Sequence, residues 1–183
     1  MRACLLVGLL LASFGASENA QALEFTFGPN LLNNPSFENG LQSWDVNDET
    51  QVDWIVDYDF RPPNDDGLGA AVLLVQGQIS QCVSVVPGTY TMSVWALGGC
   101  ADTSTFVRID WYSDSSCSIL SGSDFETVLS NSSAWQLTSG PVQSTSSAGS
   151  ARIIVARTGS CKEAIILDNA DFTDQIFGST FDE

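Results

Sequence analysis

Hydrophobic and polar residues alternate along much of the chain. The clearest run is 89–97, which follows a Pro-Gly pair and puts Trp95 on the opposite face from Tyr90. A period of two residues indicates a β-strand with one buried face. The same alternation occurs at 106–112 and 151–157. Apolar stretches predict further strands at 70–75, 78–86, 134–138 and 165–172.

The pattern contains no convincing 3.6-residue apolar period, so no helix is expected. Clusters of Ser, Gly, Asn and Asp separate the predicted strands at the spacing typical of a β-sandwich or jelly roll. The Ser-rich stretch 140–150 is interpreted as a loop before a strand, and we find no internal repeat. The chain is therefore predicted to hold one all-β domain over residues 23–173.

Alternation also sorts side chains between core and surface. In 106–112, Arg108, Asp110 and Tyr112 share one face, and Trp111 lies on the other. We assign Trp111 to the core together with two further tryptophans, Trp44 and Trp135.

Both ends of the chain are interpreted as lying outside the domain. Residues 1–22 combine an early Arg, an apolar run over 4–16 and an Ala-x-Ala motif, which predicts a signal peptide cleaved after Ala22. The apolar run is too short to span a bilayer, and no later segment reaches that length. The protein is thus expected to be secreted or periplasmic, with a disordered acidic tail over 174–183.

Charge and composition exclude several functions. The 183 residues include 22 acidic residues, 6 basic residues and no His, for a net charge of −16. Such a surface repels phosphate backbones, so no nucleic-acid partner is expected, and it discourages highly anionic polysaccharides unless calcium bridges the charges. Without His, the commonest general base and metal ligand is missing. The chain also lacks a G-x-S-x-G elbow and a phosphate-binding Gly-rich loop, so we expect no enzyme.

Four cysteines remain after the predicted cleavage: Cys82, Cys100, Cys117 and Cys161. An even number in an oxidising compartment predicts two disulfides, with free buried thiols as the alternative. Zinc is disfavoured because there is no C-x-x-C pair and no His. Four cysteines allow three pairings, and these residues alone leave all three open.

Three motifs in order suggest a family. The first is Asn-Pro-Ser-Phe-Glu at 34–38, which follows what reads as a short entering strand at residue 30 and precedes an Asn-Gly turn and Trp44. The others are Gln-Cys-Val-Ser-Val-Val-Pro-Gly-Thr-Tyr-Thr at 81–91 and Leu-Asp-Asn-Ala-Asp-Phe at 167–172. Together they resemble secreted carbohydrate-binding modules of the CenC type. The resemblance implies a galactose-binding-like β-sandwich of two antiparallel sheets.

The resemblance also implies a structural calcium ion and a disulfide pattern. In such modules the opening Glu and the first Asp of the closing strand ligate calcium, which points to Glu38 and Asp168 here. Calcium takes six to eight oxygen ligands, and the alternative is that both residues are ordinary surface acids. The similar modules further imply the pairs Cys82–Cys117 and Cys100–Cys161. The family usually closes with Asp-Asp-Val, where this chain has Asn169 and Ala170.

Carbohydrate binding is the function that the resemblance implies, with a neutral or weakly charged glycan as the partner. Sugars need apolar faces for their C–H surfaces and polar groups for their hydroxyls. We predict that the sugar binds one exposed sheet face, which carries Trp95, Arg108, Asp110 and Tyr112. Two further aromatics, Trp54 and Tyr58, are predicted to line its rim. Aromatic packing and a plain Arg–Asp salt bridge are the alternative explanations. The alternative functions are a surface module that binds protein, and a glycan-active hydrolase or lyase.

Overall fold

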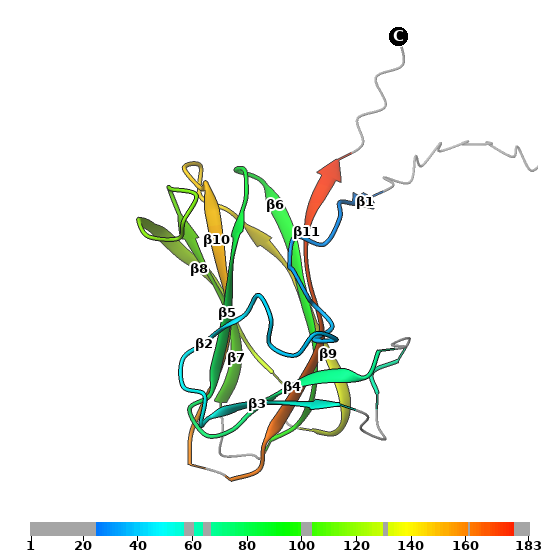
Figure 1. The fold of residues 1–183 in the computed structure, drawn as a ribbon. Helices are drawn as coiled ribbons and strands as arrows, with labels where there is room; N and C mark the ends of the chain where they lie inside the picture. The colour runs from blue at the N-terminus through cyan, green and yellow to red at the C-terminus, as the bar shows by residue number, and fades with distance from the viewer. Residues whose placement is uncertain are drawn as a thin grey trace, which may run out of the picture.

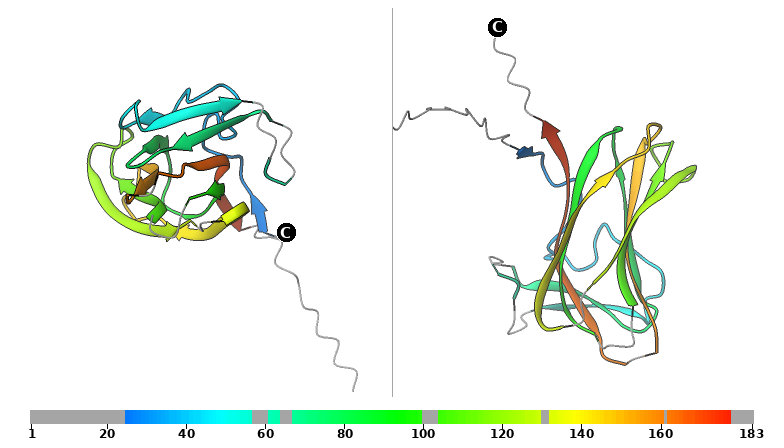
Figure 2. Two further views of the ribbon diagram at one scale, coloured as in Figure 1. Left: turned by 90° about the horizontal axis from the view of Figure 1, so that it is seen from below. Right: turned by 180° about the vertical axis from the view of Figure 1, so that it is seen from behind.

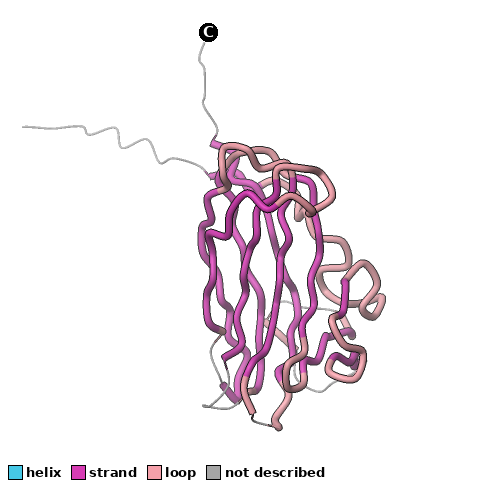
Figure 3. The backbone as a smooth tube through the Cα atoms, turned by 90° about the vertical axis from the view of Figure 1, so that its left-hand side faces the viewer, coloured by secondary structure: helices cyan, strands magenta, loops and turns pink. Residues whose placement is uncertain are grey.

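The computed structural model describes residues 25–56, 61–63, 67–99, 104–129, 132–160 and 162–177. The predicted signal peptide, Tyr58 and the predicted pair Cys100–Cys161 lie outside these ranges. The described residues form strands and loops, as Figure 3 shows. Within them, no helix is long and apolar enough to cross a membrane.

The described strands form two antiparallel sheets packed face to face (Figure 1). The β6 sheet has the order β3-β4-β11-β6-β9, and β1 also pairs with β11. The β7 sheet has the order β2-β5-β10-β7-β8. The β6 sheet comprises β1 (Phe25–Phe27), β3 (Val52–Val56), β4 (Gly69–Leu73), β6 (Thr89–Gly98), β9 (Ser132–Gln143) and β11 (Ile165–Phe177). The β7 sheet comprises β2 (Asp45–Val46), β5 (Gln78–Ser84), β7 (Ser104–Tyr112), β8 (Leu120–Val128) and β10 (Ser150–Thr158). The predicted all-β sandwich is confirmed.

The core lies between the sheets, and the alternation predicts its residues well. Along β6 and β7 every second side chain points inward and is buried. At the centre, the rings of Tyr90 and Phe172 are stacked with centroids 5.0 Å apart, and Trp111 lies 5.8 Å from Tyr90. Trp44 and Trp111 are buried as predicted, whereas Trp135 is only partly buried.

Strand β11 changes partner at a bulge. Leu167 pairs with Ala71 of β4, and the register against β6 shifts between Asp168 and Asp171. Beyond the bulge, β11 is hydrogen-bonded to the opening segment of the chain instead of to β4. The N–H of Ala170 donates to the carbonyl of Pro35 at 3.0 Å. The side chain of Asn30 bonds the backbone of both Ala170 and Phe172, at 3.0 Å each.

The chain ends differ from the prediction. The entering strand expected at residue 30 is instead β1, three residues earlier, and residues 28–44 form successive turns. At the other end, β11 runs to Phe177, where Phe25 pairs with it. The first four residues of the segment predicted to be a disordered tail thus belong to a strand; residues 178–183 lie outside the described part.

Candidate functional site

The four residues predicted to share one binding face lie on two different faces. Trp95 points outward from the β6 sheet, because its neighbours Val94 and Ala96 are buried in the core. Arg108, Asp110 and Tyr112 point outward from the β7 sheet. Because the core separates the two sheets, the prediction of a single face was wrong. Alternation showed which side chains leave the core, but not which sheet each strand would join.

On the β7 sheet the predicted polar groups are already engaged. Asp110 is 7% exposed, and its carboxylate forms an ion pair with Arg108 at 3.1 Å. The hydroxyl of Ser123 donates a further hydrogen bond to Asp110 at 2.6 Å. The pair is thus part of the sheet surface, as the salt-bridge alternative proposed, and its carboxylate has little capacity left for a ligand.

Tyr112 is covered because the loop 113–119 folds back over this face. The disulfide Cys82–Cys117, predicted from the resemblance, is confirmed, with Cα atoms 6.1 Å apart. It anchors the loop to β5. Arg152 donates to the carbonyl of Cys117 at 3.2 Å, and its guanidinium lies 5.5 Å from the centre of the Tyr112 ring. Only 8% of Tyr112 remains exposed, so its ring offers no platform for a sugar.

Trp95 lies on a more open surface. Across β6 it stands opposite Leu137 of β9 and Asp168 of β11. Leu137 is half exposed, whereas Asp168 is fully buried and accepts a hydrogen bond from the N–H of Asn169 at 2.7 Å. This surface offers one partly buried indole beside an apolar side chain.

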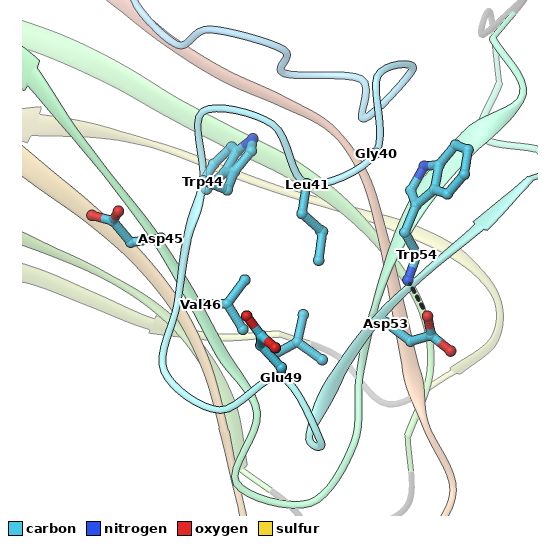
Figure 4. A pocket seen from close by; sticks show the side chains of 9 residues that line it. Gly40, Leu41, Trp44, Asp45, Val46, Glu49, Asp53 and Trp54 are labelled. Carbon is cyan, nitrogen blue, oxygen red and sulfur yellow. Dashed lines mark hydrogen bonds between the residues drawn. The ribbon is translucent and has the colours of Figure 1, made fainter.

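A groove of about 530 Å³ lies between the loop 40–46 and strand β3. Figure 4 shows Trp44 and Trp54 on opposite sides of this groove, with Leu41 between them. The lining residues are Gly40, Leu41, Trp44, Asp45, Val46, Glu49, Val52, Asp53 and Trp54. Of the predicted rim residues, Trp54 therefore does line a concave site.

Hydrogen bonds and packing fix both indoles. The Nε1–H of Trp44 donates to the carbonyl of Asn34 at 3.1 Å, and that of Trp54 donates to the carbonyl of Phe37 at 2.8 Å. The rings of Phe37 and Trp44 are 5.3 Å apart. With both N–H groups bonded to the protein, the indoles can offer a ligand only apolar surface. That surface belongs mainly to Trp54, because Trp44 is only 6% exposed.

The charged groups of the groove are all acidic. Asp45 in β2, Glu49 in the following turn and Asp53 in β3 are exposed, and no Lys or Arg lines the groove. Figure 4 places the Glu49 carboxylate beside Val46 in the middle of the groove, whereas the carboxylates of Asp45 and Asp53 point outward on its two sides. The arrangement combines the partly exposed indole of Trp54 with exposed carboxylates, and the buried Trp44 forms the opposite wall. This groove was not predicted from the sequence, although Trp54 and four acids lie within the ten residues that follow Trp44.

The two predicted calcium ligands differ in their surroundings. Glu38 is exposed, and its carboxylate accepts hydrogen bonds from the N–H groups of Leu68 and Gly69 at 2.9–3.0 Å. Asp168 is buried at the β11 bulge, just past the Leu167–Ala71 pair. Among the described residues, no three His, Cys, Asp or Glu side chains gather at one point. Two carboxylates suit calcium chemically, and the rest of its shell would have to be carbonyl oxygens and water.

Comparisons with known proteins identify the fold. No protein-family profile matches the chain. No curated protein matches it either. Among solved structures, a CBM61 module in complex with β-1,4-galactotriose is similar at a TM-score of 0.61 and 19% identity, covering 80% of this chain and 99% of that one. A family 16 carbohydrate-binding module has a TM-score of 0.61 at 17% identity, covering 78% and 99%. The enzymatically active domain of tailspike protein 4 from bacteriophage CBA120 has a TM-score of 0.65 at 15% identity, covering 80% of this chain but 21% of that one. At these identities the likeness concerns the β-sandwich fold.

Proposed function

We propose that this protein is a non-catalytic glycan-binding module and that the groove between Trp44 and Trp54 is its binding site. The observation that carries the proposal is an open groove lined by the partly exposed indole of Trp54 and by exposed carboxylates, with the buried Trp44 on its other side. The fold is shared with modules whose structures are described as carbohydrate-binding, one of them holding a galactotriose.

The groove suits the amphipathic surface of a sugar. The C–H face of a pyranose ring packs on an aromatic ring, and its hydroxyls donate to acceptors at the edge. The volume of about 530 Å³ falls within the usual range for small-ligand sites. Catalysis is not part of the proposal, because a glycosidase needs one carboxyl group kept protonated by an apolar environment, and the three groove acids are exposed.

Glycan-array screening followed by calorimetry tests the proposal. Trp54→Ala is expected to weaken binding of the best glycan about tenfold, the effect of losing about 1.4 kcal/mol of stacking. Tyr112→Phe serves as a control on the covered face and should leave affinity unchanged, and circular dichroism verifies the fold of each variant. Loss of binding in Trp95→Ala with normal binding in Trp54→Ala would move the site to the outer face of the β6 sheet.

We also propose the structural calcium ion at Glu38 and Asp168. Two carboxylates from the opening segment and the closing strand would link distant parts of the chain through one ion. A chelator is then expected to lower the midpoint of thermal unfolding, and the shift should disappear in Glu38→Gln. Equal midpoints with and without chelator would leave Glu38 as a hydrogen-bond acceptor for β4.

Export with cleavage after Ala22 is a further proposal. The disulfide between Cys82 and Cys117 supports it, because such bonds persist in oxidising compartments. Mass spectrometry of protein purified from the native host tests it, with Leu23 expected as the first residue. A full-length mass would contradict the proposal.

Protein binding is the alternative function, and one surface favours it. Val86 and Ile119, in loops, and Leu120, at the start of β8, are exposed apolar residues at the same end of the sandwich. Solvent-exposed apolar clusters mark protein contacts more often than sugar sites. If no glycan binds and Trp54→Ala has no phenotype, this end becomes the first candidate.

A further inference from the structure

We propose that the groove selects glycans that carry free amino groups, and specifically β-1,4-linked glucosamine units in their protonated form. This inference rests on the proposed function, because it names the ligand class of the same groove. The sequence suggested a neutral or weakly charged glycan. This inference specifies that the glycan is positively charged and that its charged groups lie near the carboxylates of the groove.

The first step is the distribution of charge around the groove. Asp45, Glu49 and Asp53 supply its only charged side chains, and all three are acidic. They come from three successive elements, β2, the turn after it and β3, so their arrangement is set by the same backbone that positions the two indoles. Asp53 is held by a hydrogen bond from the N–H of Trp54 at 2.8 Å.

The second step is the net effect of these charges on a ligand. The chain as a whole carries a net charge of −16, so the overall charge has the same sign as the local charge of the groove. Such a concave acidic surface concentrates cations and repels anions. Uronic acids and sulfated sugars are therefore excluded, and a neutral sugar gains nothing from the field. A positively charged sugar gains both from the carboxylates and from the faces of the indoles.

The third step is the geometry of the sugar. In a β-1,4-linked glucosamine chain, the substituents of each ring are equatorial and point outward from the ring edge. When the C–H face packs on Trp54, the amino group at C2 therefore points toward the sides of the groove. Glu49, near the middle, is the acceptor that an ammonium group would meet there, and Asp45 and Asp53 add negative charge at the sides.

Three tetrasaccharides with the same linkage test this directly. Cellotetraose has a hydroxyl at C2, N-acetylglucosamine tetramer has an amide, and glucosamine tetramer has an ammonium group when the pH is low enough to protonate it. In calorimetry at low salt, the glucosamine tetramer should bind at least about tenfold more tightly than cellotetraose. The advantage should shrink as salt is added, because the screening length falls from about 10 Å at 0.1 M to about 3 Å at 1 M.

Matched variants locate the effect. Glu49→Gln keeps the shape of the side chain and should remove several-fold of the glucosamine advantage while leaving cellotetraose affinity unchanged. Glu163→Gln makes the same change in net charge outside the groove and should have no effect. A linear polyamine of equal charge should bind much more weakly than the glucosamine tetramer, because it has no pyranose faces to pack on the indoles.

The outcomes separate this inference from the proposed function. Equal affinities for the three tetramers, with binding still lost in Trp54→Ala, would overturn the charge selection and leave glycan binding in place. In another outcome, the glucosamine tetramer binds more tightly than cellotetraose by the same factor in the wild type, in Glu49→Gln and in Trp54→Ala. That outcome would show that the tetramer is attracted to the net charge alone, and it would overturn the inference. Equal binding of the polyamine would overturn it as well. If none of the tetramers binds, the inference is wrong, and the glycan array decides the proposed function separately.

Discussion

The carboxylate of Glu38 accepts hydrogen bonds from the backbone N–H groups of Leu68 and Gly69, thirty residues further along the chain. This contact attaches the opening turns to the start of β4. We expect Glu38→Gln to lower the free energy of unfolding by about 1 kcal/mol, since a neutral amide oxygen accepts hydrogen bonds more weakly than a carboxylate and the bond to Oε2 is lost. Urea denaturation in the presence of chelator measures this contribution apart from any ion. An unchanged midpoint would mean that water replaces the carboxylate at no cost.

Gly69 is expected to be irreplaceable, because the backbone of the opening turn lies against it. A Cβ atom there would be 2.2 Å from the carbonyl oxygen of Phe37, the same oxygen that accepts from Trp54. Gly69→Ala should therefore cost about 1–3 kcal/mol of stability and weaken ligand binding by displacing Trp54. Gly88→Ala is the matched control, since its nearest neighbours would be 3.9 Å away. Similar stability of both variants, by thermal unfolding, would contradict this packing argument.

The Cys82–Cys117 disulfide should contribute substantially to stability. It closes a loop with a sequence separation of 35, for which the loop-entropy model gives about 3–4 kcal/mol. Denaturant titration of the double variant Cys82→Ser, Cys117→Ser measures the loss. We also expect faster proteolysis within 113–119 in this variant, because the loop loses its attachment to β5. A resistant loop would indicate that the hydrogen bonds of Ser150 and Arg152 are sufficient.

Asp114 should make the stability of the same loop depend on pH. Hydrogen bonds from the hydroxyls of Ser116 and Ser118, and from backbone N–H groups including that of Ile119, hold the pKa of Asp114 well below its ordinary value of 3.8. Because the folded-state pKa is lowered, its stabilising effect is present above the unfolded pKa and is lost as the pH falls through the folded value. Asp114→Ala should thus unfold at lower temperature than the wild type at neutral pH.

The difference for Asp114→Ala should shrink once the pH falls below 3.8 toward the folded-state pKa. Thermal unfolding of both proteins across this pH range checks the sign. A difference that stays constant with pH would show that the loop loses packing rather than an ionised acceptor.

Side-chain alternation predicted the strands that line the core but not their neighbours. Strands such as β6 and β10 carry apolar residues at every second position, and burial on one face of a strand requires that pattern. Sheet membership depends on contacts between segments far apart in sequence. Consecutive strands β6 and β7 fall in opposite sheets, which separated Trp95 from Tyr112.

Strands β3 and β8 are among those that were not predicted from the sequence, because neither has a clear apolar alternation. β8 lies at the edge of its sheet, and its sequence consists largely of Ser, Gly and acidic residues. β3 is short and sits within an acid-rich stretch, where Asp53 interrupts the apolar pattern. The groove forms because β3 lies beside the loop that holds Trp44. The sequence shows both tryptophans, but it does not show that they lie on opposite sides of one groove.

The first and last described strands, β1 and β11, meet at the end of the sandwich away from the groove. β1 lies beside the end of β11 at one end of the molecule, and β3 lies toward the other, as Figures 1 and 2 show. A fluorescent protein, a catalytic domain or a solid support joined directly before Phe25 or after Phe177 would therefore start on the side away from Trp54. The fold is suited to use as a modular affinity reagent, in which orientation on a surface follows from where the chain is attached.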